Sequence, residues 1–386
     1  MINIFGPLNT LGIGVHCYNL AKAYEKRKRS QMNASGEPPV LAMFPPFGRD
    51  GIQDTHTQRW LSNRVFSDVR RQPSLMIFDT QFMFHFAGNP RIGFVVFETT
   101  EFTPLQINAI RSLDHVIVPT IWAQVVLENY GVSSFVVNEG FDPETFPMSI
   151  LLKPEDKDRP FRFIHVGKLE ERKGTIQAVR CFAREFSATE SVELVLRSEN
   201  PFLDNGGRSV VSEALNQEGF RAVRWLQPGA PSVWERDSQR VYWTESVNKL
   251  SPMYIAADCG IFPSKGEGWG LPILECIASG TPVICGNWTG MSEYIRNGEG
   301  TQYPEELILA HAKLELAQDG IWFHGDRGDW FVPEDHEVEK KMRWAFDHAR
   351  DLIREAAWIN AVLEARKFTW DRAAEQLDHV LARILK

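Results

Sequence analysis

Short apolar runs alternate with longer amphipathic stretches over most of this chain. The apolar runs are expected to be strands, at residues 2–5, 75–78, 93–97, 116–118, 134–137, 161–166, 192–196, 222–225, 259–262 and 282–285. The stretches between them have helical periodicity, for example at residues 15–29, 121–130, 175–186 and 272–278. Because strand–helix alternation produces parallel sheets with right-handed crossovers, the pattern predicts an α/β fold.

Residues 147–160 form the best candidate for a linker. Their sequence, PMSILLKPEDKDRP, holds three prolines and a cluster of charges, and a new strand follows it. We therefore expect an N-terminal Rossmann-like domain over residues 1–152 and a second over residues 153–366. The chain length of 386 residues fits two domains. In parallel sheets ligands bind beyond the carboxyl ends of the strands, so we expect a site in a cleft between the domains.

Composition and cysteine usage exclude several classes of protein. Lys and Arg number 42 and Asp and Glu 50, so the net charge of −8 argues against a surface that binds polyanions throughout. No apolar run approaches the roughly 18 residues of a membrane helix, and the first residues lack the features of a signal peptide. The five cysteines show no C-x-x-C spacing, which predicts neither a zinc site nor a disulfide framework and favours the cytoplasm.

The first predicted strand leads into a glycine-containing loop, GPLNTLGIG, at residues 6–14. Gly12 and Gly14 would let the backbone approach a ligand at the start of the following helix. The complete G-x-G-x-x-G pattern is absent because Cys17 stands at its last position, which disfavours a nicotinamide site. A simple strand–helix turn is the alternative interpretation.

Two segments of the expected second domain carry the charged residues of a candidate site. Lys168, Arg172 and Lys173 follow the predicted strand 161–166, where three cations suit a diphosphate, although a solvated loop would also be charged. Glu267 and Glu275 stand eight residues apart in EGWGLPILE, and the glycines of the intervening Gly-Trp-Gly predict a loop. Glu275 is expected in the first turn of a helix, where it would be stabilised and could accept hydrogen bonds from sugar hydroxyls.

These segments resemble the family 4 glycosyltransferases of the GT-B fold. EGWGLPILE is similar to their E-x7-E motif, and GKLEERKG to their G-[RK]-L-x-x-x-K-G motif. The similarity continues in AADCGIFPS and ASGTPVI of the second domain. Looser similarity is found in RIGFVVFETTEF of the first domain, so the resemblance covers nearly the whole chain. The chain departs from the family where Lys168 replaces the usual Arg and Trp269 the usual Phe.

The resemblance implies a retaining glycosyltransferase that moves a sugar from a nucleotide-sugar donor to an acceptor hydroxyl. Lys168 and Lys173 would hold the diphosphate, Glu275 the ribose and Glu267 the donor sugar. Further donor contacts would come from Gly12, Gly14, Arg172, Gly268, Trp269, Gly270 and Leu271. The family implies no cofactor and no metal, because cationic side chains neutralise the leaving diphosphate. It also implies that the last helix, residues 367–386, packs back on the first domain.

The acceptor is the least constrained part of the prediction. His85 and Glu98 follow predicted strands and are candidates for the acceptor or sugar side of the site. Residues 22–71 hold ten Lys or Arg and five Asp or Glu. This stretch is either a solvated helix face or a site for an anionic acceptor, such as a lipid-linked phosphate, a polysaccharide or DNA. Peripheral attachment to a membrane is therefore an alternative to a purely cytoplasmic location.

Three other functions remain open at this point. A sugar-nucleotide epimerase shares the GT-B fold and would act without an acceptor. A phage-type enzyme of the same architecture would glycosylate a hydroxymethylated base in DNA, with steeply salt-dependent binding. A nucleotide-sugar-binding protein without catalysis is the third alternative. The only D-x-D sequence, Asp156 to Asp158, lies in the expected linker and is not expected to bind a metal.

Overall fold

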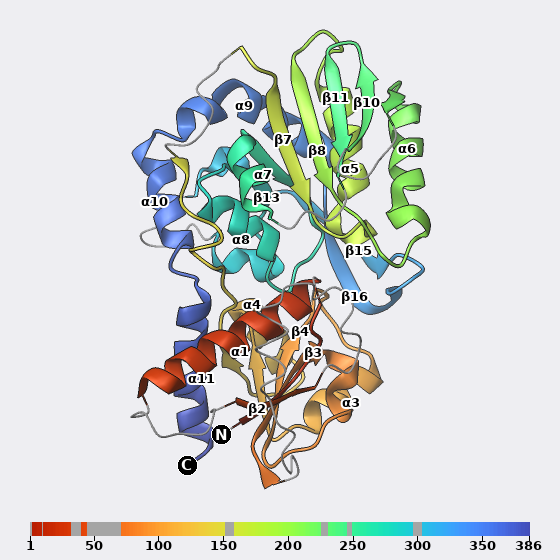
Figure 1. The fold of residues 1–386 in the computed structure, drawn as a ribbon. Helices are drawn as coiled ribbons and strands as arrows, with labels where there is room; N and C mark the ends of the chain where they lie inside the picture. The colour runs from red at the N-terminus through yellow and green to blue at the C-terminus, as the bar shows by residue number, and fades with distance from the viewer. Residues whose placement is uncertain are drawn as a thin grey trace. The chain divides into compact units, whose positions relative to one another are not determined.

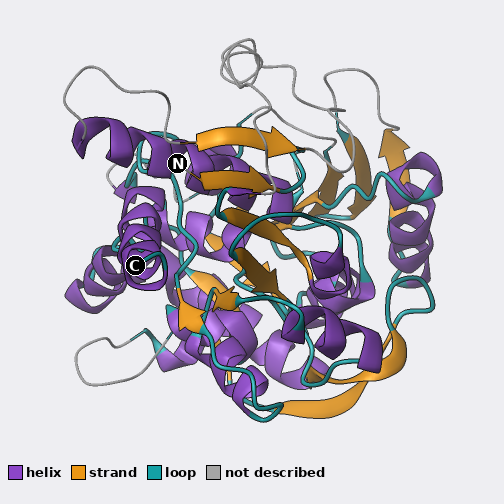
Figure 2. Cartoon of the chain, turned by 90° about the horizontal axis from the view of Figure 1, so that it is seen from below, coloured by secondary structure: helices purple, strands orange, loops and turns teal. Residues whose placement is uncertain are grey.

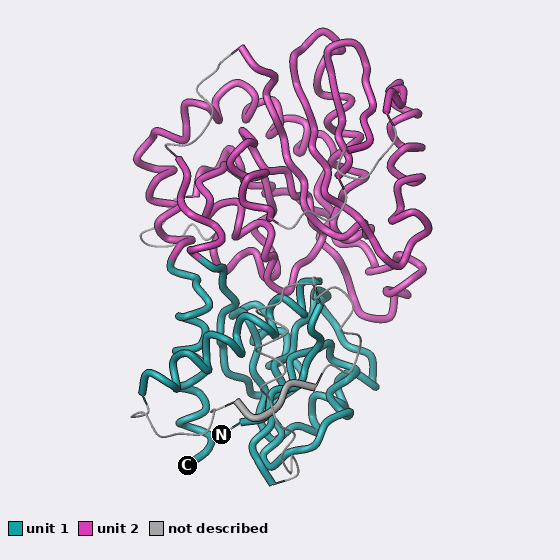
Figure 3. Tube along the Cα trace, viewed as in Figure 1, with its two compact units in different colours: residues 1–142, 367–386 teal, residues 143–366 magenta. Residues whose placement is uncertain are grey.

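The computed structural model divides the chain into two compact units (Figure 3). Unit 1 comprises residues 1–142 and 367–386, and unit 2 comprises residues 143–366. The structure describes residues 2–9, 11–31, 40–44, 71–150, 158–224, 231–244, 249–295 and 303–386. Strands and helices alternate along both units (Figure 2).

The division between the units falls ten residues before the expected boundary at 152. The reason is visible in residues 149 and 150, which already pack on unit 2. Ser149 N donates a hydrogen bond to Ser279 O at 3.1 Å, and the Ile150 side chain lies against Gly280. Phe141, by contrast, pairs with Thr369 in unit 1. Most of the expected linker, residues 151–157, lies outside the described residues and includes Asp156.

Unit 1 contains a six-stranded sheet in which every pairing is parallel (Figure 1). Its strand order is β2-β1-β3-β4-β5-β6. The strands are β1 (Ile2–Phe5), β2 (Val40–Phe44), β3 (Ser74–Asp79), β4 (Arg91–Val96), β5 (His115–Val118) and β6 (Phe135–Val136). Strand β2 was not predicted, because the sequence around it carries little strand signal.

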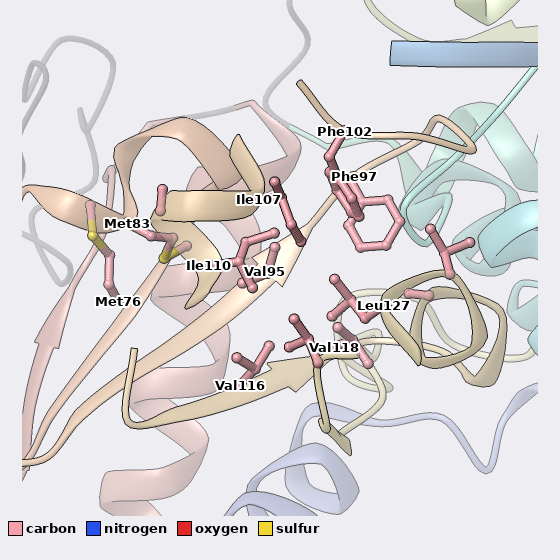
Figure 4. Close-up of a cluster of buried hydrophobic side chains, with 14 of the residues drawn as sticks. Met76, Met83, Val95, Phe97, Phe102, Ile107, Ile110, Val116, Val118 and Leu127 are labelled. Atoms are coloured by element: carbon pink, nitrogen blue, oxygen red, sulfur yellow. The ribbon is translucent and has the colours of Figure 1, made fainter. Parts of the chain in front are cut away.

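The helices of unit 1 pack their apolar sides on this sheet. They are α1 (Gly12–Gln31), the 3-10 turn η2 (Thr80–Phe84), α3 (Pro104–Arg111), α4 (Ile121–Glu128) and α11 (Trp370–Ile384). Figure 4 shows part of the core, where side chains of β3, β4 and β5 meet those of η2, α3 and α4. Thr103 caps α3 with a reciprocal hydrogen-bond pair to Gln106, so the helix begins at a defined residue.

Helices α1 and α11 are joined by ion pairs. Asp378 accepts hydrogen bonds from Arg27 at 3.2 Å and from Lys28 at 2.5 Å, and Lys26 pairs with Asp371 at 2.9 Å. The basic cluster at residues 26–29 therefore contacts the last helix of its own unit. These contacts argue against the interpretation that this cluster binds an anionic acceptor. The second basic cluster of the stretch, up to Arg70, lies outside the described residues.

Unit 2 contains an eight-stranded sheet in the order β14-β13-β12-β7-β8-β11-β10-β9. Pairings from β14 to β11 are parallel, whereas β10 pairs antiparallel with both neighbours. The strands are β7 (Phe161–Val166), β8 (Val192–Arg197), β9 (Arg221–Arg224), β10 (Ser232–Arg236), β11 (Gln239–Trp243), β12 (Cys259–Phe262), β13 (Val283–Gly286) and β14 (Ile308–Leu309).

A separate antiparallel hairpin and six helices complete the described part of unit 2. The hairpin consists of β15 (Ala312–Gln318) and β16 (His324–Pro333) (Figure 1). The helices are α5 (Thr175–Glu185), α6 (Arg208–Gln217), α7 (Ser251–Ala256), α8 (Leu271–Ala278), α9 (Asp335–Leu352) and α10 (Ala356–Ala365). Together the units form an α/β architecture with two Rossmann-like parallel sheets, as expected. Within the residues that the structure describes, no helix has the length and apolar character needed to cross a bilayer.

Candidate active site

The most strongly organised polar cluster of unit 2 centres on Glu267. This residue lies in the loop between β12 and α8 and is buried. Ser264 Oγ donates a hydrogen bond to Glu267 Oε1 at 2.7 Å, and Glu267 N donates to Thr289 Oγ1 at 3.0 Å. Gly290 N donates to Glu267 O at 2.8 Å. Both the carboxylate and the backbone of Glu267 are therefore fixed before any ligand binds.

Two of the three predicted cations contact this carboxylate. Lys173 Nζ lies 2.7 Å from each oxygen of Glu267, and Arg172 Nη1 lies 3.1 Å from Oε2. Arg172 also donates to Gly266 O at 2.6 Å. Burial alone would raise the pKa of Glu267, but the charges of Lys173 and Arg172 outweigh it and lower the pKa to about 2. The carboxylate is ionised at neutral pH.

The cations reach Glu267 because two loops pack closely together. Arg172 and Lys173 lie in the 3-10 turn η4 (Glu171–Lys173), which follows β7, and Glu267 follows the adjacent strand β12. Gly174 ends η4 with φ 68°, and a Cβ at this position would collide with the carbonyl of Pro263. Glycine is required at position 174 because of its positive φ and because of this close approach. The two loops follow the carboxyl ends of the adjacent strands β7 and β12, which brings their charged residues together.

Lys168, the third predicted cation, is held by a different partner. Its ammonium forms an ion pair with Glu170, and Glu170 Oε2 also lies 3.4 Å from Arg172 Nη2. Glu170 therefore links Lys168 to Arg172 and, through Arg172, to Glu267. Sequence reasoning missed Glu170 because an acidic residue among three cations gives no sign of which cation it contacts.

Glu275 lies in the second turn of α8, and its expected place in the first turn was wrong. The helix begins at Leu271, one residue earlier than predicted, after Gly270 with φ 93°. Glu275 is 8% exposed, and within the described chain no hydrogen bond or ion pair reaches its carboxylate. Burial raises its pKa to about 8, so the expected stabilisation by the helix N-terminus was also wrong.

The turn η6 (Thr289–Glu293) and Tyr294 pack against the loop formed by Gly268, Trp269, Gly270 and Leu271. Tyr294 Oη donates to Trp269 O at 2.9 Å, and a Cβ at Gly290 would collide with Gly268 O. The Trp269 ring is buried, with its centroid 5.4 Å from that of Tyr294. Trp269, which stands where the resembled motif has Phe, therefore adds a buried apolar ring to the core. The backbone of the loop is held in a fixed position.

The predicted residues of unit 1 lie at the ends of its elements. Gly12 and Gly14 open α1, and a Cβ on Gly14 would collide with Asn9, so this glycine is needed for the loop itself. A Cβ on Gly12 would meet no described atom within 4 Å. His85 follows η2 and is exposed, whereas Glu98 follows β4 and is half-buried. Their contacts with a ligand stay a prediction.

His165 and the cysteines lie in the core of the protein. His165 Nδ1 lies 2.8 Å from Ile261 O, and its Nε2 lies 2.9 Å from Thr175 Oγ1. Burial lowers the pKa of His165 to about 4, so it is neutral and structural. All five cysteines are described, buried and free of disulfides. In the described ranges no three His, Cys, Asp or Glu side chains are grouped to hold a metal ion.

Residues 160–319 match the family model described as "Glycosyl transferases group 1". Over these residues the chain is similar to that family. All of the charged residues around Glu267, together with Glu275, lie within the matched segment. The hairpin strand β15 also falls inside it, whereas β16 begins just beyond its end.

Curated relatives of this chain are named for several activities. O-antigen chain mannosyltransferase B of Escherichia coli is 28% identical over 218 residues, covering 55% of this chain and 43% of the relative. D-inositol 3-phosphate glycosyltransferase of Streptosporangium roseum is 26% identical over 267 residues, covering 67% and 52%. The chain thus spans about half the length of these relatives.

Solved structures show that the chain shares the GT-B fold. HepE of Anabaena, in complex with UDP and glucose, superposes with a TM-score of 0.65 at 14% identity, covering 99% of both chains. A glycosyltransferase of Rickettsia africae superposes with a TM-score of 0.64 at 11% identity, covering 100% of this chain and 98% of the other. At these identities the likeness concerns the fold, and it extends over both units.

Proposed function

We propose that this protein is a retaining glycosyltransferase that uses a nucleotide-sugar donor. The observation that carries the proposal is the contact of buried, ionised Glu267 with Lys173 and Arg172 at the carboxyl ends of β7 and β12. At that position two cations that can bind phosphate oxygens lie next to a carboxylate that can accept hydrogen bonds from sugar hydroxyls. A sugar diphosphate requires both kinds of group. The site lies within the segment that matches the group 1 glycosyltransferases.

The two cations would supply the diphosphate contacts. Arg172 offers a planar fork of donors and Lys173 a compact charge, and both form strong bonds to phosphate oxygens. When they turn to a diphosphate, the carboxylate of Glu267 is released to accept hydrogen bonds from the donor sugar. Lys168 would join them from its position beside Glu170, which explains how a Lys can replace the usual Arg.

Glu275 would bind the ribose. Its carboxyl group is buried and, in the described residues, has no protein partner, so a pair of ribose hydroxyls would satisfy it. An ionised carboxylate accepts two hydrogen bonds from such a diol, whereas the protonated form accepts fewer. Ribose binding would therefore favour loss of the Glu275 proton.

Transfer would proceed without a protein nucleophile. The side-chain cations would stabilise the negative charge that develops on the leaving diphosphate, which removes the need for a metal ion. A leaving phosphate oxygen could take the proton of the acceptor hydroxyl on the same face of the sugar, so that the anomeric configuration is retained. The E. coli relative is named for a mannosyl group, and HepE was solved with UDP and glucose. Donors of both kinds are therefore candidates.

A panel of nucleotide sugars tests the proposal. Thermal unfolding would be followed with UDP-glucose, UDP-galactose, UDP-N-acetylglucosamine, GDP-mannose and ADP-glucose, because a bound donor raises the melting temperature by mass action. The stabilising donor would then be incubated with candidate acceptors and the products analysed. Stabilisation by one donor and sugar transfer are expected. Conversion of the donor sugar without an acceptor would instead identify an epimerase, and the absence of any stabilising donor would contradict the proposal.

A further inference from the structure

The tip of the β15–β16 hairpin presents a tryptophan to solvent. Trp322 is 44% exposed, and its ring centroid lies 5.6 Å from that of Phe202, which is 58% exposed and belongs to the loop after β8. The two rings meet edge to face at 72°. They come from segments 120 residues apart, so the pair is created by the placement of the hairpin (Figure 1). Exposed aromatic pairs of this kind commonly mark ligand or partner sites.

The backbone at Trp322 is held in place by hydrogen bonds within its own turn. Asp319 Oδ1 accepts hydrogen bonds from the backbone N–H groups of Ile321, Trp322 and Phe323 at 2.8, 2.8 and 2.9 Å. Burial would raise the pKa of Asp319, but these bonds lower it, so its carboxylate is ionised at neutral pH. Behind the turn, Phe323 packs on buried Trp330 with ring centroids 4.8 Å apart. The hairpin tip is therefore well ordered.

Phe202 is fixed by a similar turn. Its backbone N–H donates to Asn200 Oδ1 at 3.0 Å, while Asn200 Nδ2 donates to Leu169 O at 2.8 Å. Asn200 is buried, so the turn is anchored in unit 2. Both aromatic residues thus lie on hydrogen-bonded backbone turns, so the backbone loses little conformational entropy when a ligand binds, which favours affinity.

The aromatic pair lies beside the candidate donor site. The ammonium of Lys168 lies 5.3 Å from the ring centroid of Phe202 and 5.7 Å from that of Trp322. Because Lys168 is one of the cations proposed for the diphosphate, a ligand on these rings would be a neighbour of the donor. This position suits an acceptor.

Trp322 also lines a pocket of about 330 Å³. Its polar lining includes Glu171, Gln177, Asn200 and Asp319. Gln177 Oε1 is buried, and no described group donates a hydrogen bond to it. Carboxylate and amide oxygens next to an aromatic wall suit a ligand that is rich in hydroxyl donors and has apolar C–H faces.

The charges of the pocket distinguish a sugar from nucleic acid. Four carboxylates line it, from Glu170, Glu171, Asp319 and Asp335, against two cations, Lys265 and Arg180. Lys265 is paired with Glu171, and two of the other carboxylates are paired with cations outside the lining, Glu170 with Lys168 and Asp335 with Arg184. Single-stranded nucleic acid binds stacked aromatics within a positively charged groove, whereas this lining would repel its phosphates. Neutral sugar hydroxyls would instead donate to the carboxylates.

We propose that Trp322, Phe202 and this pocket bind a pyranose ring of a carbohydrate acceptor. The inference rests on the proposed glycosyltransferase function and assigns the acceptor to the carbohydrates. The flat C–H face of the sugar would lie on the aromatic rings, with its hydroxyls directed to the polar lining. The hairpin would thereby contribute an acceptor subsite from the same unit that holds the donor cations.

The experiment measures sugar binding and nucleotide binding separately. Saturation-transfer NMR would test methyl α-mannopyranoside, methyl α-glucopyranoside, methyl β-galactopyranoside and maltotriose, and calorimetry would measure UDP and GDP. Trp322→Ala and Phe202→Ala would be compared with Leu316→Ala, a control on β15 whose side chain is 63% exposed. Trp322→Phe keeps an aromatic face and serves as the conservative variant.

At least one glycoside is expected to bind, with affinity reduced about fivefold to tenfold by either alanine variant, as for loss of one aromatic contact. Leu316→Ala should have no effect, Trp322→Phe should retain most of the binding, and nucleotide affinity should be largely kept in all variants. Two outcomes would overturn the inference while leaving the donor site intact. One is nucleotide binding without any glycoside binding, and the other is preferential, salt-sensitive binding of a dT12 oligonucleotide. Loss of nucleotide affinity with unchanged sugar binding would show that the rings only position Lys168.

Glycoside binding that depends on Trp322, without any nucleotide binding, would instead separate the two proposals. It would retain a carbohydrate site on the hairpin and contradict the nucleotide-sugar function.

Discussion

Lys173 Nζ lies 2.7 Å from both carboxylate oxygens of Glu267, a residue 94 positions further along the chain. Both side chains are largely buried. Removal of one partner from a buried ion pair leaves the other charge without compensation, which is strongly destabilising. Loss of either partner alone is therefore expected to destabilise unit 2. The pair also places a cation that can bind phosphate next to a carboxylate that can accept hydrogen bonds from sugar hydroxyls.

Lys173→Ala is expected to weaken nucleoside-diphosphate binding by about tenfold or more, since a charge-assisted hydrogen bond contributes about 1.5–3 kcal/mol. Calorimetry with the nucleotide of the stabilising donor measures the effect. Lys340→Ala, which removes an exposed cation of α9, is the matched control. The double variant Lys173→Ala/Glu267→Gln removes the uncompensated carboxylate and separates binding from stability. Unchanged affinity in both variants would exclude Lys173 from the diphosphate site.

Glu267→Gln and Glu275→Gln are expected to act differently. Glu275→Gln should weaken the binding of free nucleotide and of donor alike, because it alters the proposed ribose contact. Glu267→Gln should leave free-nucleotide affinity unchanged or tighter, since Lys173 is released, and should chiefly slow transfer at saturating donor. Calorimetry and turnover would be measured for both variants. Equal loss of nucleotide affinity in the two would refute this division of roles.

Nucleotide affinity is expected to rise with pH between about 6 and 8. Free Glu275 has its pKa raised to about 8 by burial, and a ribose diol favours the ionised form, so binding releases a proton in this range. The slope can reach tenfold per pH unit for one proton. Calorimetry in buffers of different ionisation enthalpy would count the protons. A slope of the same size in Glu275→Gln would assign the proton to another group.

The same carboxyl group makes a predictable contribution to folding. Because its pKa is higher in the folded state than in the unfolded chain, its contribution to stability is fully present below about pH 4.5 and is lost as pH rises to about 8. The free energy of unfolding of Glu275→Gln should therefore fall less steeply than that of the wild type over this range. Urea titrations at several pH values provide the comparison.

Activity is expected to be independent of added metal. The proposed charge stabilisation comes from Lys168, Arg172 and Lys173, so excess EDTA should leave turnover close to its value without chelator. The assay would use the stabilising donor with and without Mg²⁺ or Mn²⁺ after chelation. A loss of activity that either ion restores would show that the side-chain cations do not suffice.

Asp378→Asn is expected to lower the stability of unit 1 by about 1 kcal/mol, as for a partly buried ion pair at a helix contact. Asp378 accepts hydrogen bonds from Arg27 and Lys28, which join α11 to α1. Asp371→Asn is the matched control on the same helix, because its pair with Lys26 is well exposed and should contribute little. Denaturant unfolding of both variants makes the comparison. Equal effects would show that Asp378 has no special role.

Sequence alone determined the buried parallel strands. The expected limits of β1, β7 and β12 agree with the structure at both ends, because these strands are short segments rich in apolar residues and their signal is local. The hairpin β15–β16 and strands β10 and β11 were missed. Their residues mix charged and apolar side chains, as in Lys313 to Glu315, so the apolar residues show neither the repeat of a strand nor that of a helix.

Sequence also placed the cations Lys168, Arg172 and Lys173 after a strand, and it placed Glu267 and Glu275 around a helix start. Only the tertiary structure decided that Lys173 contacts Glu267 while Lys168 contacts Glu170, and that Glu275 is buried enough to hold a proton. Secondary structure follows from the pattern of apolar and polar residues within a short segment of the sequence. Charge pairing and desolvation depend instead on which distant segments pack together, and no local pattern contains that information.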